Sequence, residues 1–132
     1  MALGSEEQEL MADPRLGEAI ALFNNAEWYP CHDGFEELWH ETAGPMRPVL
    51  QGILQVAVAH LHLERGNLRG ATILLGEGLG RLQNAGPDAL GVDLQVLRDL
   101  AQARLQALQN GDDPDRFPCP VLRPVNRPGD DL

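Results

Sequence analysis

The sequence contains no lysine, so all ten of its basic residues are arginine. Without an ε-amino group the chain cannot form a Schiff base with a carbonyl substrate or offer a lysine to a phosphate. Positive charge is scarce as well, because 20 acidic residues give the chain a formal net charge of −10. Such a surface repels phosphate backbones and anionic lipids, so we expect no nucleic-acid partner and no membrane partner.

Cysteine and long apolar runs are also scarce. Cys31 falls in a helical pattern and Cys119 lies between prolines, so a disulfide scaffold is not expected and a reducing cytoplasm is the expected location. The longest apolar run, around residues 53–63, is broken by polar side chains and is too short to span a bilayer. No cationic, apolar leader opens the sequence, and we therefore expect a soluble cytoplasmic protein without a secretory signal.

Only 5% of the residues are aromatic, whereas 43% are hydrophobic, so the core must consist mainly of leucine, alanine, valine and isoleucine. Leucine and alanine favour helices. A chain of 132 residues is long enough to bury one core without disulfides or metal. We therefore expect an all-α, single-domain bundle.

Hydrophobic periodicity and helix-boundary residues predict about five helices. They cover roughly residues 14–26, 31–44, 46–65, 68–84 and 93–109. The bundle domain then spans residues 13–110. Residues 1–12 are expected to be a flexible acidic lead, and residues 111–132, which hold five prolines, an extended or disordered tail.

Two of the predicted helices carry packing signals. The helix over 46–65 is apolar on nearly every side, which is typical of the central helix of a bundle or of a homodimer surface. The helix over 68–84 contains Gly70, Gly76, Gly78 and Gly80, each of which weakens it by about 1 kcal/mol relative to alanine. These glycines indicate either close helix-helix approach or loose local structure.

The helix that begins near residue 31 carries a candidate site. On a helical wheel its core side is centred on Phe35 and Leu38, and His32 and Glu36 fall together at the boundary next to Trp39. The acidic residues on the opposite face are interpreted as solvated charges. These residues are Asp33, Glu37 and Glu41.

A polar stripe on the apolar helix over 46–65 predicts partners for this pair. Gln51, Gln55 and His62 fall within roughly 40° of one another on the wheel. Burying an amide or an imidazole without a partner costs about 1–3 kcal/mol. Because the two helices are joined by a short connection, we expect them to pack as an antiparallel pair that turns this stripe toward His32 and Glu36.

Two further features are kept apart from that site. His60 and Glu64 form a second four-residue pair on another side of the helix, where we expect a helix-end contact or an interface. Cys31 adjoins His32, but neighbours on a helix point about 100° apart. No asparagine or aspartate is placed to orient a histidine as its base, so we expect Cys31 to pack in the core.

The stretch CHDGFEELWHE, followed by LQGILQVAVAHLHLERGNLRGA, resembles a small all-helical family with an HxxxExxW motif, catalogued as domain of unknown function 309. The resemblance covers about residues 20–85. It rests on Phe23-Asn24, His32, Glu36, Trp39, Gln51 to Ala57, His62 and Asn67 to Ala71. It implies the helical fold and indicates that the motif residues matter, but it implies no substrate or reaction. His62 corresponds to the histidine of the family's third helix, and His60 is extra.

One hypothesis for the site is a divalent metal. Two imidazoles and one carboxylate, from His32, His62 and Glu36, form a donor set suited to Zn²⁺ or Fe²⁺ with positions left open for water. Such an ion acidifies its bound water and permits hydrolysis. HxxxE by itself is a weak signal, because it lacks the second histidine and the intervening glutamate of HExxH.

Two other hypotheses need no metal. In the first, His32 and Glu36 act as acid and base, Trp39 forms an apolar wall, and Gln51 and Gln55 orient a small-molecule ligand. In the second, these residues form a buried hydrogen-bond network that fixes helix register, and the protein acts through association. The sequence leaves open whether the protein is an enzyme.

Overall fold

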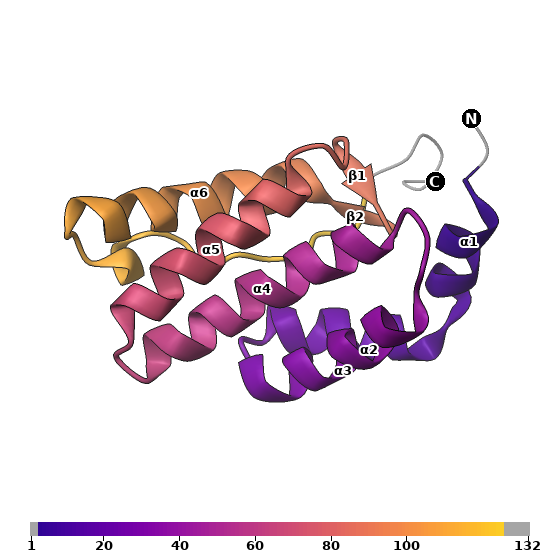
Figure 1. Cartoon of the computed structure of the whole chain (residues 1–132), viewed down its shortest axis with the longest axis horizontal. Coiled ribbons are helices and arrows are strands. Elements are labelled where there is room, and N and C mark those ends of the chain that lie inside the picture. Colours follow the sequence, from indigo (N-terminus) through magenta and orange to yellow (C-terminus); the bar gives the residue numbers. More distant parts are fainter. Residues whose placement is uncertain (1–2, 126–132) are drawn as a thin grey trace, which may run out of the picture.

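The computed structural model describes residues 3–125, and these residues form six α-helices, a two-stranded hairpin and one 3₁₀ turn (Figure 1). The elements are α1 (Ser5–Ala12), α2 (Pro14–Asn24), α3 (Trp28–Glu41), α4 (Arg47–Glu64), α5 (Leu68–Leu82), β1 (Asp88–Ala89), β2 (Val92–Asp93), α6 (Leu94–Asn110) and η1 (Pro114–Arg116). The predicted all-α, single-domain fold is confirmed. Helices α2 to α6 correspond to the five predicted helices, and α1 is additional.

Helix α4 is the centre of the bundle. It packs against α3 and α5, and α6 packs alongside α5 (Figure 1). Leu50, Ile53, Val56 and Ala57 of α4 are almost completely buried. The apolar circumference predicted for this helix is thus covered largely by the chain's own helices. The homodimer remains a prediction.

None of the helices in residues 3–125 combines the length and the apolar character needed to cross a membrane.

Helix α3 begins at Trp28, three residues before the predicted start at Cys31. The prediction assumed that Pro30 ends helical geometry at Tyr29. Pro30 instead occupies the third helical position, where a missing N–H costs nothing because first-turn amides have no intrahelical acceptor. The earlier start adds Trp28, which is 4% exposed, to the core.

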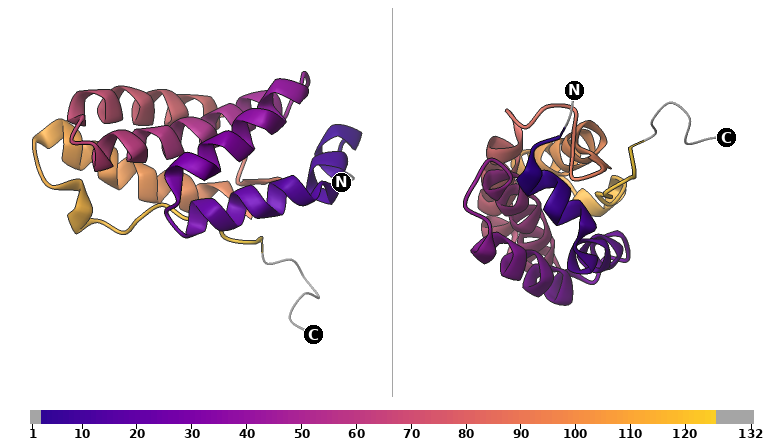
Figure 2. Two further views of the ribbon diagram at one scale, coloured as in Figure 1. Left: turned by 90° about the horizontal axis from the view of Figure 1, so that it is seen from below. Right: turned by 90° about the vertical axis from the view of Figure 1, so that its right-hand side faces the viewer.

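Sequence reasoning placed no helix in residues 1–12, but Ser5–Ala12 forms α1, which lies across one end of the bundle (Figure 2). Both carboxylate oxygens of Glu6 accept backbone hydrogen bonds, one from Gly44 and one from Met46, each at 2.7 Å. Glu7 accepts another from Leu90 at 2.8 Å. Two adjacent glutamates thereby hold two distant loops, a role that the helical wheel cannot reveal.

No strand was predicted, yet β1 and β2 pair as an antiparallel hairpin with Ala89 opposite Val92. Leu90 and Gly91 form its two-residue turn, and both have positive φ, 55° and 76°. Such a turn matches the twist of a hairpin and normally takes asparagine or glycine at its first position. Leucine is accommodated here because its side chain is buried, only 3% exposed.

The proline-rich segment follows the bundle as an extended strap as far as Val125, and residues 126–132 of the predicted tail lie outside the described residues. The side chain of Asn24 pairs with Leu122 as a strand would, accepting from its N–H at 2.7 Å and donating to its carbonyl at 2.9 Å. The N–H of Val125 donates to Gly91 at 2.9 Å, so the strap also lies against the hairpin.

Helices α4 and α5 approach each other closely at two glycines. A Cβ atom built on Gly78 would lie 2.9 Å from the carbonyl oxygen of Gly52, and one built on Gly52 would lie 3.1 Å from that of Gly78. Real Cβ atoms essentially never come closer than 3.0 Å. Gly76 and Gly80 would meet nothing within 4 Å. Close approach, one of two readings of the α5 glycines, therefore holds for Gly78.

We predict opposite effects for two alanine substitutions on α5. Gly78→Ala forces the helices apart, and its overpacking cost of about 1–3 kcal/mol exceeds the gain of about 1 kcal/mol in helix propensity, so the free energy of unfolding falls. Gly80→Ala meets no neighbour and raises it by roughly 0.5–1 kcal/mol. Urea denaturation of both variants measures the two changes, and equal shifts in one direction would contradict the packing described.

Candidate functional site

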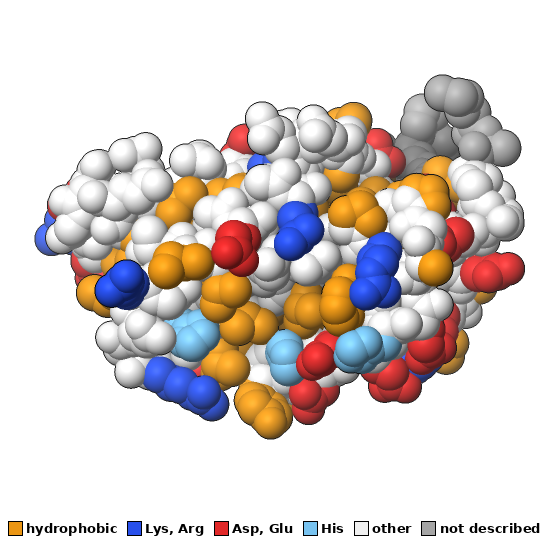
Figure 3. Space-filling view, in the orientation of Figure 1, with side chains coloured by type: hydrophobic (Ala, Val, Ile, Leu, Met, Phe, Trp, Pro, Cys, Tyr) orange, Lys and Arg blue, Asp and Glu red, His pale blue; other side chains and the backbone are white. Residues whose placement is uncertain are grey.

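The two motif residues His32 and Glu36 lie in contact on the surface of α3. The Nε2 atom of His32 is 2.9 Å from Oε2 of Glu36. Their side chains are 28% and 39% exposed. Figure 3 shows histidine side chains next to acidic ones along the lower edge of the molecule, where α3 lies in Figure 1. The pair is therefore open to solutes rather than enclosed.

The register of α3 places this pair. Phe35 and Leu38 are at most 1% exposed and fix which face of α3 turns inward. Residues four apart stack on one face of a helix, and His32 and Glu36 stand at the edge of the buried face. The spacing in the sequence is thus sufficient to bring the two side chains together.

Asp33 and His40 extend the pair to a chain of four side chains. Oδ1 of Asp33 lies 3.2 Å from Nδ1 of His32, and Nε2 of His40 lies 3.5 Å from Oε1 of Glu36. Donor atoms of His32, Asp33 and Glu36 all lie within 4.8 Å of one another, and they form the group with metal-ligand spacing in residues 3–125. Asp33, predicted to be a solvated charge, belongs to this group.

The indole ring of Trp39, three residues after Glu36 on α3, lies close to the side chains of Arg47 and His40. The guanidinium of Arg47 stands 4.0 Å above the indole ring, and the ring centroid of His40 is 4.9 Å away. Arg47 also donates to the carbonyls of Trp39 and Thr42 at 2.9 Å, which joins the end of α3 to the start of α4. The indole Nε1 is buried and has no partner in the described residues.

Two residues of the polar stripe on α4, Gln55 and His62, have partners other than the motif pair. Gln55 bonds to α5, donating to Glu77 at 3.1 Å and accepting from Arg81 at 2.9 Å. His62 lies 3.0 Å from the side-chain nitrogen of Asn67, within its own helix end. Gln51 is half-buried. The helical wheel could not tell which of two neighbouring helices Gln55 contacts.

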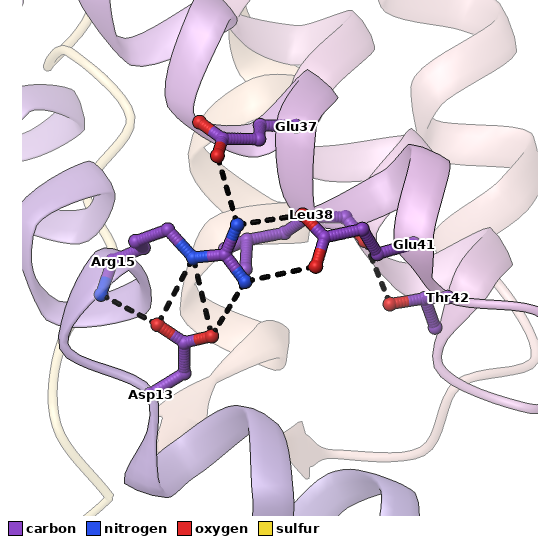
Figure 4. Close-up of polar contacts among 6 residues, drawn as sticks. All are labelled: Asp13, Arg15, Glu37, Leu38, Glu41 and Thr42. Atoms are coloured by element: carbon purple, nitrogen blue, oxygen red, sulfur yellow. Dashed lines mark hydrogen bonds and ion pairs between the residues drawn. The ribbon is translucent and has the colours of Figure 1, made fainter.

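Glu37 and Glu41, also predicted to be solvated charges, bind a cation from another helix (Figure 4). Arg15 of α2 contacts Glu37 at 2.9 Å and Glu41 at 2.6 Å, and its own neighbour Asp13 at 2.8 Å. Hydrogen bonds from this guanidinium hold the pKa of Glu41 and of Asp13 below their ordinary values. The cluster ties α2 to α3 and leaves those carboxylates less available to a ligand.

His60 is separate from the motif pair, as expected, and it is 2% exposed. Its ring packs on Trp28 with 4.8 Å between centroids, and its Nδ1 lies 2.8 Å from the carbonyl oxygen of Val56. A carbonyl only accepts, so Nδ1 carries the proton and Nε2 is a bare acceptor. Nε2 is buried without a partner in the described part of the chain. Burial lowers the pKa of His60 to about 4.

Both cysteines are free thiols. Cys31 is fully buried in the core, as predicted, and burial raises its pKa to about 12. A thiol with so high a pKa is not a nucleophile near neutral pH, because the thiolate is the reactive form.

Residues 16–74 match the sequence model of a family described as "Domain of unknown function (DUF309)". The chain resembles this family. The matched stretch runs from the first turn of α2 to the middle of α5, so it includes the motif pair, Trp39 and the whole of α4. No curated protein matches the chain.

The match to the family covers only part of the molecule. Helix α6 and the strap lie beyond the matched residues, and they supply Arg104, Asp115 and Cys119 near His60. Sequence reasoning missed this second group because its members are far apart along the chain. The extra histidine at position 60 was the one signal that pointed to it.

We predict that His60 makes the fold sensitive to mild acid. The unfolded chain takes up a proton at this residue below about pH 6.5, whereas the folded chain does so only near pH 4. Stability is therefore present above pH 6.5 and is lost as the pH falls toward 4, by roughly 2–3 kcal/mol.

Urea denaturation between pH 7 and pH 4 tests this dependence. The apolar variant His60→Leu should lose less stability over that range than the unmodified protein, and the exposed-site control His40→Gln should behave like the unmodified protein. Equal losses in His60→Leu and the unmodified protein would show that another group causes the acid sensitivity.

Proposed function

We propose that the protein binds a divalent transition metal, Zn²⁺ or Fe²⁺, through His32 and Glu36. The observation that carries the proposal is the 2.9 Å contact of their side chains together with the convergence of Asp33 within 4.8 Å. One imidazole and two carboxylates are borderline and hard donors of the kind that these ions accept.

The exposure of the pair supports an ion with open coordination positions. A structural zinc site is closed by four protein ligands, whereas catalytic sites keep a position for water or substrate. Three protein donors on one half-exposed turn leave such a position. The ion would supply a water ionised near neutral pH, so hydrolysis is the reaction class that we propose for the site.

Asp33 has a second role available in the same arrangement. Metal-bound histidines usually donate their other ring nitrogen to a carboxylate, which fixes the tautomer and strengthens the ligand. The 3.2 Å contact between Nδ1 of His32 and Asp33 has this form, and it leaves Nε2 of His32 directed toward Glu36. We therefore propose Asp33 as either a third ligand or the residue that orients His32.

Gln51, Gln55 and Trp39 keep the roles predicted from the sequence as proposals, whereas His62, the third ligand predicted from the sequence, is left out of the site that we propose. His62 is a third ligand only if its side chain leaves Asn67. Both ends of the Gln55 amide are engaged by α5 in exposed hydrogen bonds, so Gln55 can orient a ligand only if those bonds break. The indole N–H of Trp39 is a buried donor without a partner in the described residues, and the role of Trp39 as an apolar wall stays a proposal.

Zinc titration by calorimetry on metal-free protein tests the proposal. The unmodified protein should bind one Zn²⁺ per chain. We expect His32→Ala and Glu36→Gln to weaken binding by more than about 100-fold, and Asp33→Asn to weaken it by about 10- to 100-fold if it acts as the orienting residue.

Two matched controls separate the motif pair from other residues of the same type. His62→Ala removes a half-buried histidine bound to Asn67, and Glu18→Gln removes an exposed glutamate on α2. Both should bind zinc like the unmodified protein. The proposal fails if the unmodified protein takes up no zinc, or if the two motif variants bind it as well as the controls do.

A further inference from the structure

A second hollow, independent of the motif pair, lies where the end of α4 meets α6 and the strap. Its volume is about 220 Å³, room for one small organic molecule since a water takes roughly 30 Å³. Its wall includes Trp28, His60, Leu63, Glu64, Arg104 and Asp115. It therefore combines an apolar wall with charges of both signs.

Arg104 gives one side of this hollow its positive charge, and some of its N–H donors are unused. It is 7% exposed and donates to the carbonyls of Phe117 at 2.8 Å and Pro118 at 3.2 Å. Its third contact is with Asp115 at 3.5 Å. A guanidinium has five N–H bonds, so donors remain after these contacts, and their fork geometry matches a carboxylate.

His60 is the acceptor side. Because its Nδ1–H is committed to Val56, the ring can only accept at Nε2, which is buried and unpartnered among residues 3–125. The carboxylates of Glu64 and Asp115 belong to the same wall. A ligand that donates hydrogen bonds and carries positive charge fits this side.

We propose that this hollow binds a free α-amino acid with an apolar side chain. The carboxylate of the amino acid accepts hydrogen bonds from Arg104, and its ammonium group donates to Nε2 of His60 and faces the two acidic side chains. Trp28 and Leu63 contact the apolar side chain.

The charges of the wall favour a zwitterion over other ligands. One arginine and two carboxylates give the wall a net charge of −1, which repels a simple carboxylate. An amine without a carboxylate offers no acceptor to the remaining N–H donors of Arg104. A bare metal ion does not suit the hollow either, because the donor atoms of its wall lack metal-ligand spacing in the described residues.

Calorimetry at pH 7 with L-leucine and two compounds that each lack one of its charged groups tests the inference. L-leucine should bind, whereas N-acetyl-L-leucine, which lacks the ammonium charge, and 3-methylbutylamine, which lacks the carboxylate, should each bind at least about tenfold more weakly. No heat with L-leucine, or equal binding of all three compounds, would overturn the proposal.

A matched pair of histidine variants locates the binding. His60→Leu keeps the size of the side chain and removes the acceptor, so the affinity for L-leucine should fall about tenfold. His62→Leu, two residues further along α4 and outside the hollow, should bind L-leucine like the unmodified protein. Equal affinity of His60→Leu and the unmodified protein would overturn the assignment.

Protection of a thiol supplies a test that needs no variant. Cys119 also lines the hollow and is half-buried, whereas Cys31 is fully buried elsewhere in the core. L-leucine should slow the alkylation of Cys119 by iodoacetamide, N-acetyl-L-leucine should not, and Cys31 should stay unmodified throughout. Alkylation of Cys119 at one rate with and without L-leucine would contradict occupancy of the hollow.

Discussion

The close approach of α4 and α5 at Gly52 and Gly78 sets how the helices are arranged around α4. It brings α4 and α5 closer than any side chain would allow and thereby fixes which side of α4 each neighbour covers. Gln55 lies next to this contact and is drawn to Glu77 and Arg81 on α5. Helix α3 packs against α4 as well. The motif pair, by contrast, is formed within α3 alone, because His32 and Glu36 are four residues apart on that helix.

A site confined to one helical turn has physical consequences. His32 and Glu36 need only the helix to meet, so their geometry survives shifts of neighbouring helices, but few donors converge on any bound group. The second hollow has the opposite character. Its wall comes from α3, α4, α6 and the strap, so it exists only when Arg104 holds the strap against α6. Local and assembled sites therefore coexist in this small chain.

What the sequence could predict follows from the range of the interactions. The five main helices and the His32–Glu36 pair depend on spacing along one helix, and both were predicted. The partner of Gln55 depends on how α5 packs, which periodicity does not encode. Likewise, Glu6 binds backbone groups about forty positions away, and the sequence of a short acidic helix does not indicate such distant partners. Pro30 was misjudged because its effect depends on its position within the helix.

Imidazole ¹H–¹⁵N NMR during a zinc titration tests directly whether the metal-binding donors lie on α3. It also tests whether His62 of α4 takes no part in binding. The ring-nitrogen signals of His32 should move on binding, because Nε2 takes the metal while Nδ1 keeps its proton toward Asp33. The signals of His62 and the buried His60 should not move. Zinc-dependent shifts of His62 in step with those of His32 would contradict the account.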